Sequence, residues 1–206
     1  MVEFWTLMAF IPAGLALNLS PGADMMFCLG LGLRSGPKAA IAASAGISTG
    51  GMVHVLLAGL GLGAAVAAMP WLFDVIRWLG VAYLLYLAWG ALRAGPVRGA
   101  KVQATGMRKA FMDGMIVNLM NPKVILFVLA FVPQFVDPAQ GSILGQFLIF
   151  GLVLAVGGMV INGGVGVFAG TLGQRLTGPR FARGLGWVSA GIFTALAARL
   201  AVLERA

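Results

Sequence analysis

Two charged side chains interrupt stretches of the chain that are otherwise apolar. Lys123 lies in the run from Asn118 to Val136, where a helical interpretation places it far from either membrane surface. A cation at that depth costs at least about 2.5 to 3.5 kcal/mol, so it is a functional candidate by default. Asp24 lies in a comparable place in the first apolar stretch. The sequence therefore offers one ammonium and one carboxylate for binding a charged ligand.

Prolines next to both charges predict that the helices break there. Proline has no backbone N–H and clashes with the preceding turn, so we expect interruptions at Ser20-Pro21-Gly22 and at Asn121-Pro122. Ser20 and Asn121 have side chains suited to capping the half-helix that follows each break. Broken helices that carry charge at mid-membrane depth are a common way to build a transporter's binding site.

The two charges suggest complementary chemistry. Asp24 could take the ammonium of a zwitterion while Lys123 takes its carboxylate, and Asp24 could also be the group that couples transport to protons. The alternative for both residues is a structural ion pair, because opposite charges in low dielectric are costly to separate. We expect binding or coupling, with the ion pair as the alternative.

Other polar residues lie near the breaks or within the apolar stretches. Asn18 and Asn118 each precede a break and could satisfy freed backbone groups or line a cavity. His54 could relay protons, although a histidine bonded within the bundle is the simpler interpretation. Cys28 is expected to serve packing, and Asp113 to pair with Lys109 one helical turn away.

The composition indicates an all-α integral membrane protein. Of the 206 residues, 60% are hydrophobic and only 10% are charged, and the mean hydropathy is +0.98. A membrane-spanning helix needs about 20 apolar residues. Arginines flank the third and sixth apolar segments, which are therefore short and need these side chains to extend toward the interfaces. The six segments are about 4–33, 39–69, 75–92, 110–136, 145–172 and 184–203.

The two halves of the chain repeat one another. Gly14-x-x-x-Asn18-Leu19 recurs as Gly114-x-x-x-Asn118-Leu119, and Gly50-Gly51-Met52-Val53 recurs as Gly157-Gly158-Met159-Val160. A repeat with three spans must insert its second copy upside down. We therefore predict six transmembrane helices in two inverted three-helix repeats, with helices 1 and 4 broken and the substrate between the repeats.

The predicted units are a first repeat (1–92), a basic cytoplasmic linker (93–109) and a second repeat (110–206). Most of the 14 lysines and arginines fall in the loops after segments one, three and five. Because basic loops stay on the cytoplasmic side, both termini are expected outside.

Several classes of function are excluded. The net charge of +8 reflects cytoplasmic loops rather than a nucleic-acid partner. One cysteine and one histidine cannot form a disulfide or a multi-histidine metal site, and no G-x-x-x-x-G-K-[ST] motif is present. We expect no cofactor, no metal ion and no enzymatic activity.

Five groups of residues carry a resemblance to a known family: Asn18-Leu19-Ser20-Pro21-Gly22-Ala23-Asp24, Gly32-x-Arg34-x-Gly36, Gly80-x-x-Tyr83-Leu84-x-Tyr86-Leu87, Asn121-Pro122-Lys123 and Pro133-Gln134-Phe135. On these landmarks the chain resembles the LysE/RhtB family of amino-acid exporters over its whole length. It departs from the pattern at Ala23, where the family commonly has a second proline.

The resemblance implies a bacterial inner-membrane exporter of amino acids or close derivatives, driven by the proton motive force. We expect alternating access, with Lys123, Asp24, Asn18, Asn118, Asn121 and Ser20 as substrate-binding residues. A single buried carboxylate slightly favours a neutral substrate. The alternatives are a divalent-cation exporter of related architecture, which needs more ligands in one cavity, and an intramembrane enzyme. Glycine-rich faces could form a homodimer or serve internal packing.

Overall fold

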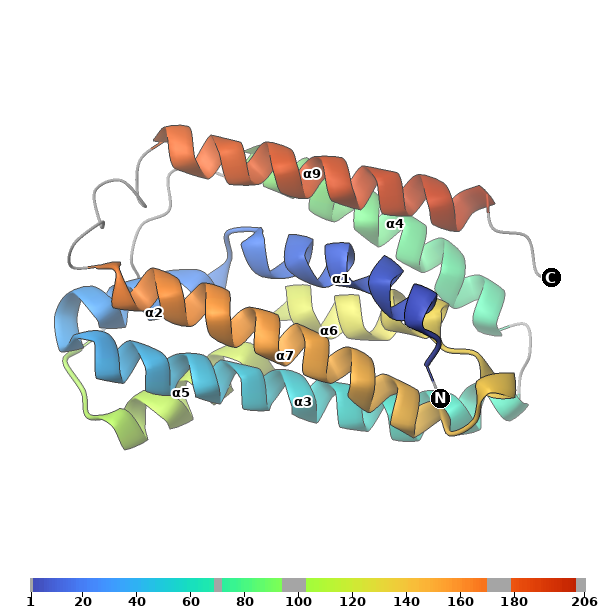
Figure 1. The fold of residues 1–206 in the computed structure, drawn as a ribbon, viewed down its shortest axis with the longest axis horizontal. Helices are drawn as coiled ribbons and strands as arrows, with labels where there is room; N and C mark the ends of the chain where they lie inside the picture. The colour runs from blue at the N-terminus through green and yellow to red at the C-terminus, as the bar shows by residue number, and fades with distance from the viewer. Residues whose placement is uncertain (1, 69–71, 94–102, 170–178, 203–206) are drawn as a thin grey trace.

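The computed structural model describes residues 2–68, 72–93, 103–169 and 179–202, and within these ranges every regular element is helical (Figure 1). The fold-class prediction of an all-α chain is confirmed at this level. Parts of the predicted linker and of the loop before the last segment lie outside the described residues, and so does the end of the chain. The elements follow the predicted segments closely.

The first apolar segment forms two helices rather than one. Helix α1 (Phe4–Leu19) ends before Ser20, and α2 (Ala23–Ser35) begins after Gly22. The two axes differ by 55°. The break falls where proline and glycine predicted it, and Ala23 does not remove it.

The fourth segment is broken in the same way. Helix α5 (Met107–Leu119) is followed by α6 (Pro122–Ala130), and a short 3₁₀ helix, η1 (Val132–Phe135), extends it. The bend between the two parts is again 55°. A second 3₁₀ turn, η2 (Pro138–Gln140), lies in the loop that follows.

Two long helices, α3 (Pro37–Ala68) and α7 (Ile143–Val167), pack against each other in the bundle. Within the described ranges, these two are long and apolar enough to cross a membrane, and up to four spans result if each bent pair counts as one. Helices α4 (Leu72–Arg93) and α9 (Pro179–Val202) are also long, but the count of spans covers only the residues that the structure describes in full, which are too few in a row in these two helices. The prediction of six spans is therefore not confirmed and stays a prediction.

The helices lie in layers (Figure 1). Helices α4 and α9 run side by side along one edge of the bundle, and α1 and α6 lie between this pair and the α3–α7 pair. Helix α3 packs against both α5 and α7, and α2 packs against α3 and α7. Both halves thus present a bent pair, a long helix and a further helix in the same order.

Glycines allow these helices to approach closely. A Cβ atom added at Gly46 of α3 would overlap the carbonyl of Phe111 on α5, and one at Gly114 would overlap the backbone of Ala43. At the other end of the bundle, aromatic rings fill the space, with Phe10 and Phe150 at 4.6 Å between centroids. Backbone contact around the breaks thus fixes their position relative to α3 and α7.

Candidate functional site

Asp24 is held by side chains from the opposite half of the chain. It lies in the first turn of α2 and is 8% exposed. Asn118 Nδ2 donates to Asp24 Oδ2 over 2.9 Å, and Asn121 Nδ2 donates to Asp24 Oδ1 over 3.0 Å. Each carboxylate oxygen therefore accepts one hydrogen bond from the second break.

Lys123 makes the reverse connection. It lies in the first turn of α6, and its Nζ donates to Leu17 O over 2.9 Å and to Ser20 O over 2.8 Å. These are carbonyls at the end of α1, where no further turn of helix can satisfy them. A Cβ added at Gly22 would lie 3.1 Å from Lys123 Nζ, so the absence of a side chain there lets the ammonium lie against the break.

The two charges nonetheless do not pair directly. Across the part of the chain that the structure describes, the only contact within 4.0 Å between opposite charges joins Lys109 and Asp113, at 2.9 Å. That surface pair was predicted and is confirmed, whereas the alternative of a direct Asp24–Lys123 ion pair is wrong. Amides compensate the carboxylate, and backbone carbonyls compensate the ammonium.

The capping predictions have opposite outcomes. Asn121 caps α6, because its Oδ1 accepts from Lys123 N over 3.1 Å, and this prediction is confirmed. The prediction for Ser20 is wrong, since the N-cap of α2 is Gly22 and no side chain caps it. Pro21 and Gly22 place Ser20 at the end of α1, where it contributes its carbonyl to Lys123.

The repeated asparagines contact the repeated glycines of the other half. Asn18 Nδ2 donates to Leu154 O of α7 over 3.1 Å, and a Cβ at Gly158 would lie 3.2 Å from Asn18 Oδ1. Likewise, a Cβ at Gly50 of α3 would lie 3.1 Å from Asn118 Oδ1. The sequence left the role of these asparagines open, and the structure shows both bonding and lining a cavity.

His54 lies near the second break, with Nε2 3.3 Å from Asn118 O. It is half-buried on α3 and bonded within the bundle, as the simpler interpretation predicted. Cys28 is fully buried in a cluster with Leu31 and Ala43, consistent with packing.

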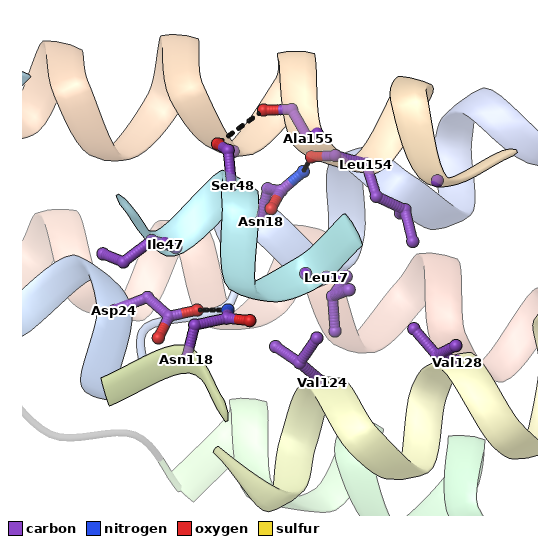
Figure 2. Close-up of a pocket in the computed structure, with 13 residues that line it drawn as sticks. Leu17, Asn18, Asp24, Ile47, Ser48, Asn118, Val124, Val128, Leu154 and Ala155 are labelled. Carbon is purple, nitrogen blue, oxygen red and sulfur yellow. Dashed lines mark hydrogen bonds between the residues drawn. The ribbon is translucent and has the colours of Figure 1, made fainter. Parts of the chain in front are cut away.

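Two cavities share Asp24 as a lining residue, and Figure 2 shows the larger of them. The first, of about 30 Å³, lies among α1, α2, α3, α5, α6 and α7 and is lined by the polar residues Asn18, Asp24, Ser48 and Asn118 together with apolar residues. The second, of about 10 Å³, is lined by Asp24, Lys123 and Ser20. A cavity needs roughly 10–15 Å³ on this measure to hold one water molecule. The two cavities are therefore too small for an amino acid in this structure.

Sequence reasoning gave no role to three polar residues. Tyr83 Oη on α4 donates to Lys123 O over 2.9 Å and so supports the start of α6. Ser48 Oγ on α3 donates to Ala155 O of α7 over 2.9 Å, and Asn162 lines the Lys123 cavity. A polar residue in an apolar helix was the available signal. No described residues form a group of three or more His, Cys, Asp or Glu side chains suited to a metal ion.

Comparison with known proteins matches this chain along its length. A family described as "LysE type translocator" matches residues 15–204. A homoserine/homoserine lactone efflux protein of Salmonella typhimurium is 32% identical, covering 99% of this chain and 98% of that protein. A leucine efflux protein of Enterobacter sp. is 30% identical over 74% of this chain and 72% of its own length. An uncharacterized membrane protein of Vibrio cholerae is 31% identical over 86% of each chain. No solved structure matches.

Proposed function

The chain belongs to the family of LysE type translocators, and on that premise we propose that it exports amino acids or close derivatives across the bacterial inner membrane. Two relatives that cover most of the chain carry efflux names, one for homoserine and its lactone and one for leucine. The apolar helices around a buried polar cluster are suited to this role. The resemblance found in the landmark residues leads to the same family.

The observation that carries the proposal is the set of hydrogen bonds by which each helix break binds the charged side chain of the other break. Asp24 of the first half is held by amides of the second half, and Lys123 of the second half is held by carbonyls of the first. An ammonium has three N–H donors, and these two bonds use two of them. A substrate carboxylate can take the third donor, while the substrate ammonium approaches Asp24.

We propose that a neutral zwitterion fits this pair best. Asp24 is the one carboxylate among the residues that line the two cavities, and it would be used by the α-ammonium. A second cationic group on the substrate would find no further carboxylate there. Asn18, Ser20, Asn118 and Asn121 complete the polar surface around the ligand.

Transport requires the closed site to open on each side in turn. The cavities hold only a few water molecules, so α1–α2 and α5–α6 must separate for an amino acid to enter. The breaks at Pro21 and Pro122 allow such movement, because the backbone there lacks regular helical bonds. The contacts between repeated asparagines and repeated glycines support an inverted duplication that could open alternately to the two sides.

Protons are proposed as the coupling ion. Asp24 is the first candidate for the coupling group, because its carboxylate lies between the two cavities. His54 is the second, through its contact with the carbonyl of Asn118. The basic loops would face the cytoplasm and both termini the outside, with α4 and α9 crossing through the extension of their arginines to the interfaces.

Vesicle efflux tests the proposal. Lipid vesicles containing the full chain would be loaded with radiolabelled alanine, homoserine or lysine, and efflux would be followed with and without an imposed pH gradient. We expect efflux of the neutral amino acids that the gradient accelerates. Rates equal to those of protein-free vesicles for every amino acid would refute the function.

A further inference from the structure

Asn118 leaves one buried polar atom without a partner. The residue is 3% exposed, and among the described residues its Oδ1 accepts no hydrogen bond. Its orientation is fixed by Asp24, since a carboxylate only accepts and so must face the Nδ2 of Asn118. The oxygen therefore points away from Asp24 (Figure 2).

This oxygen faces the larger of the two cavities. Asn118 and Gly51 both line it, and a Cβ added at Gly51 would lie 3.8 Å from Asn118 Oδ1 with no closer contact. Apart from Asn118, Asn18, Ser48 and Asp24, the lining is apolar, with Ile47, Val124, Val128 and Leu154 among its members. Buried polar atoms are almost always satisfied, so this acceptor favours a donor that enters the cavity.

The cavity's place relative to the two charges indicates what enters. Asp24 lines both cavities, whereas Lys123 lines only the smaller one. An amino acid with its ammonium at Asp24 and its carboxylate at Lys123 would direct its side chain to the other side of Asp24. That side is the larger cavity.

We propose that this cavity is the side-chain subsite and that Asn118 Oδ1 is its specificity-determining acceptor. The inference rests on the proposed function, and it identifies the substrate's side chain as the group by which the site distinguishes amino acids. The subsite takes a short uncharged side chain of about two or three non-hydrogen atoms, because about 30 Å³ holds roughly two water molecules. A hydroxyl on that side chain donates to Asn118 Oδ1.

Homoserine and norvaline give a matched pair of probes. Their side chains have the same number of non-hydrogen atoms and differ in a terminal hydroxyl against a methyl group. A buried acceptor left unpaired disfavours the methyl analogue, and we expect homoserine to compete about tenfold better. Competition is measured against efflux of radiolabelled alanine, whose side chain is too short to reach Asn118.

Gly51→Ala tests the subsite without removing any hydrogen bond. The new methyl group fits without a clash but fills the space in front of Asn118 Oδ1. Gly164→Ala is the matched control, since it makes the same change within α7 where a Cβ meets nothing within 4 Å. Direct replacement of Asn118 is less informative, because it also removes a donor from Asp24.

We expect Gly51→Ala to lose the preference for homoserine over norvaline, whatever its rate of alanine export, while Gly164→Ala keeps this preference. Equal competition by homoserine and norvaline in the unaltered chain would overturn the subsite and indicate that water satisfies Asn118. A preference retained by Gly51→Ala would overturn it as well. In both cases alanine export would leave the proposed function intact, whereas absence of all export would remove both proposals.

Discussion

The amide of Asn118 donates to the carboxylate of Asp24 over 2.9 Å, although the two residues lie 94 positions apart. Lys123 makes the opposite connection, to the carbonyls of Leu17 and Ser20. Each half of the chain therefore supplies the hydrogen-bond partners of the other half's buried charge. A ligand that competes for either connection changes how the halves are held together, which links binding to movement.

Lys123→Met should abolish export. Methionine keeps the length of the side chain but removes the charge that receives the substrate carboxylate, and we expect a loss of at least about 30-fold. Vesicle efflux measures the rate, and membrane content of the protein shows that it inserts. Lys109→Met is the control, because this lysine is exposed on the surface. Export by Lys123→Met at the unaltered rate would contradict the binding role.

Asp24→Asn should separate the efflux of substrate from its coupling to protons. The replacement keeps the size of the side chain but cannot gain or lose a proton. If Asp24 couples transport to protons, an imposed pH gradient no longer accelerates efflux in this variant. Asp113→Asn, which alters only a surface ion pair, should respond like the unaltered chain. A gradient response retained by Asp24→Asn would assign coupling elsewhere, with His54 the next residue to replace.

Tyr83→Phe should weaken the site from a distance. Its hydroxyl donates to Lys123 O over 2.9 Å, and one such bond contributes about 0.5–1.5 kcal/mol. We expect lower thermal stability in detergent and export slower by a few-fold. Tyr86→Phe is a close control, since Tyr86 is 67% exposed. Equal melting temperatures of the two variants would show that the Tyr83 hydroxyl does not support α6.

Gly46→Ala should destabilise the bundle around the second break. The added methyl group would overlap the carbonyl of Phe111, so α3 and α5 must separate. Overpacking of this kind typically costs about 1–3 kcal/mol. Gly191→Ala, where a Cβ meets nothing within 4 Å, should be neutral or slightly stabilising. Thermal unfolding in detergent compares the two, and similar values would argue against close contact of α3 with α5.

Single cysteines should reveal the orientation. Cys28 is the one cysteine of the chain and is fully buried, so it should not react with a membrane-impermeant maleimide. Lys38→Cys, in the first turn of α3, and Ala139→Cys, in η2, place thiols at exposed positions that are predicted on opposite sides of the membrane. We expect Ala139→Cys to be labelled from outside intact cells and Lys38→Cys only after lysis. The reverse pattern would invert the topology.

The sequence by itself determined the helical class, both breaks and the cap at Asn121. These features are local: proline cannot donate a backbone hydrogen bond wherever it lies, and the side chain of Asn121 accepts from a backbone N–H only two residues later, without help from other elements. Hydropathy likewise depends only on composition. The landmark residues were enough to identify the family before any contact was known.

Only the tertiary structure decided which groups satisfy the two charges. Asp24 could have paired with Lys123, yet the amides of Asn118 and Asn121 lie closer once α3 and α5 pack through Gly46 and Gly114. The donors to Asp24 and the partner of Tyr83 lie on other helices, and helix rotation, which sequence patterns do not fix, decides whether they meet. Ser20 was predicted to cap α2, but the break places it at the end of α1 and makes Gly22 the N-cap of α2. Its carbonyl, and not its side chain, then bonds Lys123.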